Sequence, residues 1–533
     1  MLQSNPNKGI SSFQSTITRL ENLKVIQLSI SVKNMSKRKL LIIGIDGADL
    51  DIFTNIMKFN ISIMPTLSAL IQEGMYGKLR STVPPSTIPA WTSSVTGVDL
   101  DKHGLYDFFL SVDLEEKRIE YADRTKRKHK AIWNILGEHG LKVIVVNVPV
   151  TYPPEYVNGV LVSGLLTPSL KSDFTYPTSI KEELIRLGYR IDVGDFMDHV
   201  VALKHNPIKY IEELRNLINI RVRAIEYLTQ EFNDWDCLMV VFTEIDRLQH
   251  WFMNHIIKRS YLSSLILTVY NEVDSAVARL LALSGGKGNI NVIIYSDHGF
   301  RPVRNIIFLN NILRRHGLIK VLSMSRGIST FLPTQERILQ YASKSLLVKL
   351  LRLIPTSFKR KIGLRIPVSK DFHEVLEVAD PFATKAFLFS GFIRLSRDFE
   401  PEEKYKIINK IRIIKKNMLS YGILVLHKSE VYRKPWIAHM PEFPILGIGD
   451  IRCSQLIPND PSLISMEYTD RVNIPSLLWT GVHRLHGMVI LHGPMLRGAR
   501  GLIPEARIVD IAPSVLKALG VPIPKYMDGR PIF

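Results

Sequence analysis

Short runs of apolar, mostly β-branched residues recur along the chain, and they restrict its fold more than any other feature of the sequence. Strands that are apolar on both faces and are separated by helical stretches indicate a parallel sheet covered on two sides. The runs are KLLIIGIDG (39–47), KVIVVNVP (142–149), DCLMVVFTEID (236–246) and NVIIYSDHG (291–299), and the helices expected between them are 65–73, 131–139, 179–187, 206–231 and 262–283. The sequence therefore predicts an α/β fold with a mostly parallel central sheet and helices on both faces.

Three of these runs end in an aspartate: Asp46, Asp246 and Asp297. In open α/β sheets the ligand lies beyond the carboxyl ends of the strands. We therefore expect these carboxylates to converge on one site.

Histidines accompany two of the aspartates. Asp246 and His250 are four residues apart and share one face of a helix, and Asp297 and His298 are adjacent where a strand turns. Alone, such patterns also fit a surface pair, a helix cap or an ordinary turn. Together they fit a site for zinc or a similar divalent ion, and two ions about 3.5–4 Å apart suit a phosphoryl displacement.

The segment VPPSTIPAWTSSVTG (83–97) contains six hydroxyl side chains among apolar ones. Pro89 favours the first turn of a helix over 89–96, and Gly97 is expected to close that helix. Thr87 would then lie at or just before the N-cap, where backbone amides favour negative charge. It is either a simple helix cap or a hydroxyl held at the tip of a helix.

The chain divides into four predicted parts: an N-terminal extension (1–37), a first part of the catalytic core (38–303), an inserted cap (304–440) and a C-terminal part that rejoins the core (441–533). Within the cap, residues 341–366 contain seven Lys or Arg and no acid, interleaved with leucines. Such a stretch fits a helix lying on an anionic membrane, or a solvated basic cover over a substrate cleft, which we favour.

The formal charge of +19, from 69 basic and 50 acidic residues, suggests anionic partners: small phosphorylated molecules, nucleic acid or anionic lipid. No known nucleic-acid-binding pattern occurs in the sequence. Two cysteines fit a reducing compartment, and no apolar run is long enough for a membrane span or a signal-peptide core. We expect a cytoplasmic protein.

The ordered set IGIDG, TIPAWTSSVTG, HG, D-x-x-x-H, SDHG and GVHR-x-x-G resembles the alkaline phosphatase superfamily, and within it the type I phosphodiesterase/nucleotide pyrophosphatase family. The resemblance covers about 39–300 and 479–533 and leaves the middle of the chain uncovered. It implies an alkaline-phosphatase-like sheet with a smaller inserted α+β cap. It also implies a metal-dependent phosphodiesterase that acts on a small, nucleotide-like phosphorylated substrate through a covalent phosphothreonine.

The resemblance also assigns roles to single residues, with Thr87 as the nucleophile. Backbone amides near Ile88 and Ala90 are expected to hold a phosphoryl oxygen, and Ser86 is the second candidate for the attacking hydroxyl. Two divalent ions are expected, zinc first, with manganese or another ion as the alternative. The implied ligands of the first ion are Asp46, Thr87, Asp297 and His298, and those of the second are Asp246, His250 and His483.

The sequence departs from the family at one position. Many nucleotide pyrophosphatases carry an asparagine shortly after the HG pair, where this chain has Phe108 next to Asp107, which weakens the case for nucleotide diesters. His486 and His492 are expected to be core or rim residues. The alternatives are a phosphomonoesterase or phosphomutase of the same superfamily, and a non-catalytic basic protein associated with membranes or nucleic acid. A sulfatase is disfavoured because TIPAW lacks the expected arginine.

Overall fold

The computed structural model describes residues 39–194, 206–258, 262–322, 375–376, 378–432, 440–454, 463–465 and 479–533. The predicted extension (1–37) and the basic stretch (341–366) lie outside the described residues. Within the described ranges, no helix is long and apolar enough to cross a membrane.

A ten-stranded sheet forms the centre of the molecule, in the order β20-β2-β19-β9-β1-β8-β5-β6-β7, with β21 beside β2. The four predicted strands lie side by side and parallel in its middle, as β9-β1-β8-β5, which confirms the predicted fold class. β19 runs antiparallel between β9 and β2, so the C-terminal segment rejoins the sheet as expected. The strands are β1 (Leu40–Ile45), β2 (Met75–Arg80), β5 (Val143–Val148), β6 (Gly159–Ser163), β7 (Thr175–Tyr176), β8 (Cys237–Phe242), β9 (Asn291–Tyr295), β19 (His486–His492), β20 (Gly501–Leu502) and β21 (Ala506–Arg507).

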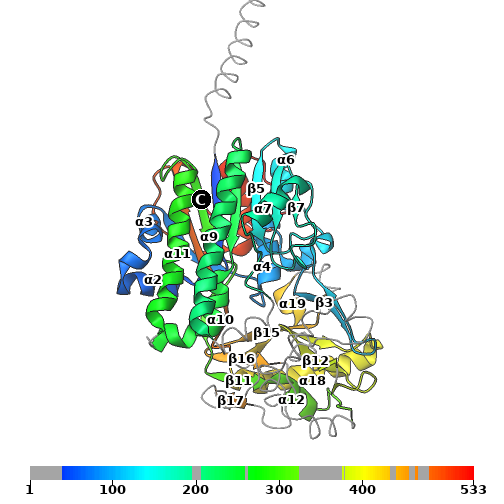
Figure 1. Ribbon diagram of the computed structural model, residues 1–533. Helices are drawn as coiled ribbons and strands as arrows, with labels where there is room; N and C mark the ends of the chain where they lie inside the picture. Colours follow the sequence, from blue (N-terminus) through cyan, green and yellow to red (C-terminus); the bar gives the residue numbers. More distant parts are fainter. Residues whose placement is uncertain are drawn as a thin grey trace, which may run out of the picture.

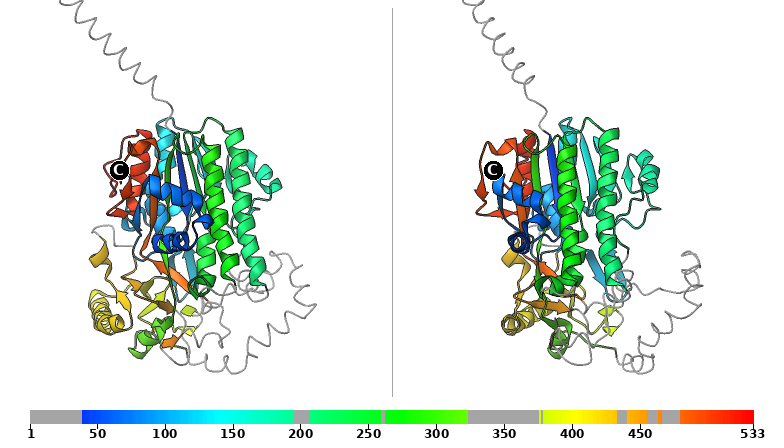
Figure 2. Two further views of the ribbon diagram at one scale, coloured as in Figure 1. Left: turned by 90° about the vertical axis from the view of Figure 1, so that its left-hand side faces the viewer. Right: turned by 60° about the vertical axis from the view of Figure 1, so that its left-hand side comes forward.

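Helices cover both faces of this sheet (Figures 1 and 2). Alternate residues of β1 point to opposite faces: Ile43 enters the core under one set of helices, and Ile42 enters the core under the other. The first set is α2 (Leu50–Phe59), α3 (Pro65–Glu73), α9 (Pro207–Glu231), α10 (Glu244–Lys258) and α11 (Ser263–Leu283). The second set is α4 (Thr87–Thr96), α6 (Ile132–Glu138) and α21 (Ile511–Leu519), and α7 (Lys181–Arg186) lies near the β7 edge. The sheet is therefore buried on both sides, as its all-apolar strands require.

A second unit with its own apolar core lies below the sheet in Figure 1. It combines the described parts of 305–465 with the hairpin β3–β4, and Phe387, Ile411 and Phe443 lie in its core. Its elements are β3 (Phe109–Asp113), β4 (Arg118–Tyr121), β11 (Asn305–Phe308), α12 (Leu309–Arg315), β12 (Ala386–Phe389), β13 (Phe392–Leu395), α18 (Pro401–Ser420), β14 (Ile423–Val425), α19 (Lys428–Val431), β15 (Phe443–Gly447), β16 (Ile451–Ser454) and β17 (Leu463–Ser465). β15 pairs with β13 and β14, and β16 pairs with β11. The unit therefore includes strands that follow residue 440.

The contact between β1 and α4 leaves no room for a side chain at position 44. A methyl group on Gly44 would overlap the ring of Trp91 and lie 2.9 Å from Cγ2 of Val241. We predict that Gly44→Ala lowers the free energy of unfolding by about 1–3 kcal/mol, because an overpacked core forces its neighbours out of place. Urea denaturation measures this loss, and an unchanged midpoint would contradict the close packing of β1 on α4.

Candidate active site

The three predicted aspartates converge at the carboxyl ends of adjacent strands. Asp46 follows β1, Asp246 lies in the first turn of α10 after β8, and Asp297 and His298 follow β9. Asp46, Asp297 and His298 form one group in which the candidate ligand atoms all lie within 4.8 Å of one another. The parallel order β9-β1-β8 brings these side chains together, as the sequence predicted.

A second group shares His298 and adds residues from α10 and β18 (Gly481–Arg484). Asp246, His298 and His483 also have candidate ligand atoms within 4.8 Å of one another. Oδ1 of Asp246 lies 3.4 Å from Nε2 of His250 and 3.3 Å from Nε2 of His483. The two Nε2 atoms of His250 and His483 are 3.1 Å apart, and the rings of His298 and His483 stack at 3.6 Å. The two groups are therefore in direct contact.

Each of the three imidazoles is oriented by a backbone carbonyl. Nδ1 of His250 lies 3.0 Å from the Gly481 carbonyl oxygen, and Nδ1 of His298 lies 3.3 Å from that of Gly299. Nδ1 of His483 lies 3.2 Å from the carbonyl oxygen of Pro85. A carbonyl oxygen only accepts, so these contacts place the proton on Nδ1 and leave the lone pair of Nε2 facing the cluster.

Each aspartate has one oxygen held by a donor. Oδ2 of Asp46 accepts from the indole N–H of Trp91 at 3.1 Å, and Oδ1 of Asp297 accepts from the Gly47 amide at 3.2 Å. Oδ2 of Asp246 accepts from Nη1 of Arg247 at 2.6 Å. These donors fix the direction in which the other oxygen of each carboxylate points.

The remaining polar atoms of the cluster are buried without a hydrogen-bond partner among the described residues: Oδ1 of Asp46, Oδ1 of Asp246, Oδ2 of Asp297 and Nε2 of His298. A buried polar atom without a partner costs about 1–3 kcal/mol, so four in one cluster require an explanation. Carboxylate oxygen and imidazole nitrogen are a donor set that zinc and similar divalent ions accept. These residues therefore fit the metal ions that the sequence suggested.

The pKa values of the cluster residues are shifted by their surroundings, and the shifts of the histidines also fit a metal site. Burial and, after it, the negative charge of Asp246 raise the pKa of Asp297 to about 7. Burial and the neighbouring Asp297 raise the pKa of Asp46 well above its usual value. Burial also raises the pKa of Asp246, but its interactions with His250 and His483 and the charge of Arg247 outweigh burial and lower it overall. Burial lowers the pKa of His250 and His298, which favours the neutral imidazole that binds metal.

Helix α4 begins two residues earlier than predicted. Ser86 is its N-cap residue, Thr87 is its first residue, and Gly97 ends it in the left-handed conformation (φ 71°) as expected. The amide of Ala90 donates to the Ser86 carbonyl at 3.1 Å, so it is the first N–H used inside the helix and is not available to a phosphoryl oxygen. Pro89 stands third in the helix, where its missing N–H costs nothing because the amides of the first turn lack helical partners.

The N-terminal half of α4 is tied to both groups of the cluster. Pro85, two residues before Thr87, contacts His483, and Trp91, one turn after Thr87, holds Asp46. Thr87 lies between these contacts and is only 4% exposed. Its roles as nucleophile and metal ligand stay predictions.

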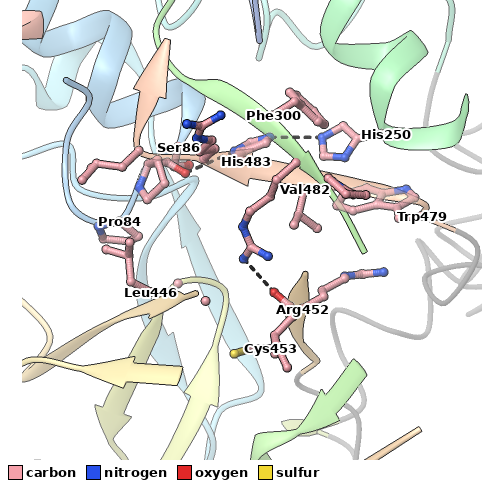
Figure 3. Close-up of a pocket in the computed structure, with 18 of the residues that line it drawn as sticks. Pro84, Ser86, His250, Phe300, Leu446, Arg452, Cys453, Trp479, Val482 and His483 are labelled. Carbon is pink, nitrogen blue, oxygen red and sulfur yellow. Dashed lines mark hydrogen bonds between the residues drawn. The ribbon is translucent and has the colours of Figure 1, made fainter. Parts of the chain in front are cut away.

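A cleft of about 1010 Å³ opens beside the cluster, between the sheet and the second unit. Figure 3 shows His250 and His483 on one side of this cleft and Leu446, Arg452 and Cys453 on the other. The N-terminal approach to α4 also lines it. The cleft is therefore the natural binding place for a substrate that reaches the cluster.

Phe108 and its neighbour Asp107, where the sequence departs from the family pattern, lie just before β3. The buried carboxylate of Asp107 accepts hydrogen bonds from Nη2 of Arg394 and Oγ of Ser390, both at 2.8 Å. Burial raises the pKa of Asp107, and Arg394 opposes that change. Phe108 lines the cleft. A phenyl ring thus lines the cleft, while its acidic neighbour links the start of the hairpin to β13.

The two spare histidines do not join the groups of candidate ligands found among the described residues. His486 begins β19 and lines the cleft, whereas His492 ends that strand, with Nε2 3.6 Å from a carboxylate oxygen of Glu73.

Sequence reasoning missed the donors that orient the aspartates, above all Arg247. This arginine follows Asp246 directly and forms ion pairs with both Asp246 and Asp192. Its Nη2 lies 2.7 Å from Oδ2 of Asp192. An arginine beside an aspartate on a helix is too common a pattern to have revealed this role.

Removing the Arg247 guanidinium is expected to weaken metal binding. We predict that Arg247→Met lowers zinc affinity about 10- to 100-fold, the usual effect of losing a group that orients a ligand. Competition with a chromophoric chelator measures the dissociation constant. Arg247→Lys keeps the charge and is the matched control, with a smaller loss expected; unchanged affinity in the Met variant would refute the orienting role.

The fold and this cluster together fit a phosphoryl hydrolase, and the family match shows that the protein belongs to this class. Residues 40–355 match the model of the family described as type I phosphodiesterase / nucleotide pyrophosphatase. The match covers more than half of the chain, and the chain therefore belongs to that family of phosphoric ester hydrolases. The matched range includes all of the predicted site residues except His483, which lies beyond it.

Among solved structures, the chain is similar to phosphonoacetate hydrolase from Sinorhizobium meliloti 1021 in complex with phosphonoformate. The two share 15% sequence identity with a TM-score of 0.54, and the similarity covers 91% of this chain and 96% of that chain. No curated protein sequence is similar enough to count as a relative. The structural similarity confirms the alkaline-phosphatase-like fold that the resemblance implied.

Proposed function

We propose that the protein hydrolyses phosphodiesters through Thr87, at a site that holds two divalent ions. The observation that carries the proposal is the pair of touching groups at the ends of β1, β8 and β9, in which four buried ligand atoms lack partners among the described residues. A tight pair of carboxylate and imidazole groups suits two ions better than one. Membership of the phosphodiesterase family supports the same reaction.

The residues have separate tasks in this proposal. Asp46, Thr87, Asp297 and His298 hold the first ion, and Asp246, His250 and His483 hold the second. Zinc suits this mixture of nitrogen and oxygen ligands, and manganese is the alternative. When bound, the two ions supply positive charge that stabilises the attacking and leaving oxygens.

Hydrolysis proceeds in two displacements at phosphorus. Oγ of Thr87 forms a bond to phosphorus, the bond to the first alcohol breaks, and that alcohol leaves with a proton. The threonine then carries a phosphodiester, which a water molecule cleaves to release the phosphomonoester and restore the hydroxyl. In this proposal the amide of Ile88, in the first turn of α4, donates to a non-bridging phosphoryl oxygen.

The test compares methyl p-nitrophenyl phosphate with p-nitrophenyl phosphate, on protein stripped by a chelator and refilled with Zn²⁺ or Mn²⁺. We expect hydrolysis of the diester to disappear on stripping, to return with metal, and to exceed hydrolysis of the monoester. Faster turnover of the monoester would instead favour a phosphomonoesterase. Phosphonoacetate is a third substrate, because the similar solved structure is named for it, and a preference for it would contradict the proposal.

A further inference from the structure

Apolar side chains form most of the wall of the cleft beside the cluster. Phe108 comes from the hairpin side, Ile256 and Ile257 from α10, and Leu446 and Ile448 from the end of β15 and the turn after it. Such a wall offers burial to an apolar group and few hydrogen bonds to a base or a sugar.

Three arginines among the described residues line the cleft, and Arg452 lies with its guanidinium carbon 4.8 Å from the centre of the Trp479 ring. The other two, Arg301 and Arg484, are engaged by oxygen atoms of the protein. Nη1 of Arg484 lies 2.9 Å from a carboxylate oxygen of Asp51 and 3.4 Å from one of Asp49. Nη2 of Arg301 donates to the Ile451 carbonyl at 2.7 Å, and its Nη1 donates to another backbone carbonyl. Their charges are therefore committed to the protein rather than presented to additional phosphates of a nucleotide.

Exposed isoleucines stand at the rim of the cleft on both units. Ile257 of α10 is 52% exposed, and Ile448 in the turn between β15 and β16 is 46% exposed. The Ile448 amide donates to the Gly422 carbonyl at 2.7 Å, which holds that turn in place. Apolar side chains that line a ligand cleft and remain exposed at its rim are typical of a binding site for an apolar ligand.

We propose that the substrates are lipid-like phosphodiesters, in which one alcohol is a long apolar chain. The phosphate of the substrate binds at the cluster, and its apolar chain lies along Phe108 toward Ile257 and Ile448. This inference rests on the proposed phosphodiesterase function and names its substrate class. An apolar chain of the substrate would pack against the phenyl ring of Phe108, which suits the presence of that ring at this position.

The test is a series of p-nitrophenyl alkyl phosphodiesters with methyl, butyl and octyl groups, used below their micelle concentrations. A buried methylene is worth up to about fourfold, so we expect kcat/KM to rise at least about 10-fold from methyl to octyl. A flat series, or a preference for the p-nitrophenyl ester of thymidine monophosphate, would overturn the substrate class while leaving the phosphodiesterase function intact. If none of these diesters is hydrolysed, the proposed function itself fails.

Two variants at the rim of the cleft test where the apolar chain of the substrate binds. Ile257→Ser and Ile448→Ser are expected to lower the octyl-to-methyl ratio of kcat/KM at least about threefold, and both positions are exposed enough to tolerate serine. Leu283→Ser is the matched control, because Leu283 is 37% exposed at the end of α11 and lies outside the cleft. We expect this variant to leave the octyl-to-methyl ratio of kcat/KM unchanged. An unchanged ratio in both rim variants would overturn the proposal.

Discussion

Replacing Thr87 with alanine is expected to lower kcat for phosphodiester hydrolysis by at least about 1,000-fold, the scale seen when a covalent nucleophile is removed. The side chain is small, and the helix keeps its N-cap at Ser86, so the fold should survive. Thermal unfolding and steady-state kinetics measured on the same preparation separate lost catalysis from lost structure. Thr87→Ser keeps a hydroxyl and should retain part of the rate.

Ser86 provides the matched control, because it is the neighbouring hydroxyl and lines the cleft. Ser86→Ala is expected to retain most of the activity. Acid quenching during turnover of a phosphodiester should trap the alkylphosphoryl group on the peptide that contains Thr87, as detected by mass spectrometry. Loss of activity in the Ser86 variant, with activity retained in Thr87→Ala, would transfer the role of nucleophile to Ser86.

Removal of the metal ions is expected to abolish activity and to make stability depend on pH. In the stripped protein, the folded-state pKa values of Asp46 and Asp297 lie above the usual 3.8, that of Asp297 at about 7. The folded state then binds more protons than the unfolded state between those values, so this contribution to stability is full below about pH 4 and is lost as the pH rises to about 7. Each proton that the folded state binds in excess of the unfolded state lowers the free energy of unfolding by about 1.4 kcal/mol for every unit by which the pH rises.

The metal-loaded protein holds these carboxylates ionised as ligands, so it should not show that loss. We therefore expect the difference in Tm between loaded and stripped protein to widen from pH 5 to pH 7, as measured by calorimetry. Asp297→Asn, which has no titrating carboxyl at that position, should show a smaller widening. Parallel pH profiles for loaded and stripped wild-type protein would contradict a metal site at these residues.

Much of the central fold was predictable because its signals are local. The run VIVVNV (143–148) is apolar at every position except Asn147, and a strand buried on both faces accommodates that pattern in so short a segment. The placement of Asp46, Asp246 and Asp297 at the ends of such runs then predicts their convergence, because parallel neighbours end at one edge of the sheet. Recognition of the ordered motifs added His483, which no local pattern would have joined to the others.

The start of α4 and the orientation of the site were less predictable. Proline at position 89 favoured a helix starting there, but it is equally compatible with the third position, and packing selected the earlier start at Thr87. The partner of Asp46 is Trp91, 45 residues away, and Arg247 reaches Asp192 across 55 residues. Nothing near these residues in the sequence specifies those contacts.

The sequence by itself thus determined the parallel sheet, the aspartates at its edge and the family of the protein, since each is written in short stretches of residues. Only the tertiary structure decided which oxygen and nitrogen atoms face the cluster, how Asp107 and Arg394 tie the start of the hairpin to β13, and what lines the cleft. These features depend on side chains that come together from distant segments. Their positions are set by the packing of the two cores rather than by the preference of any single segment.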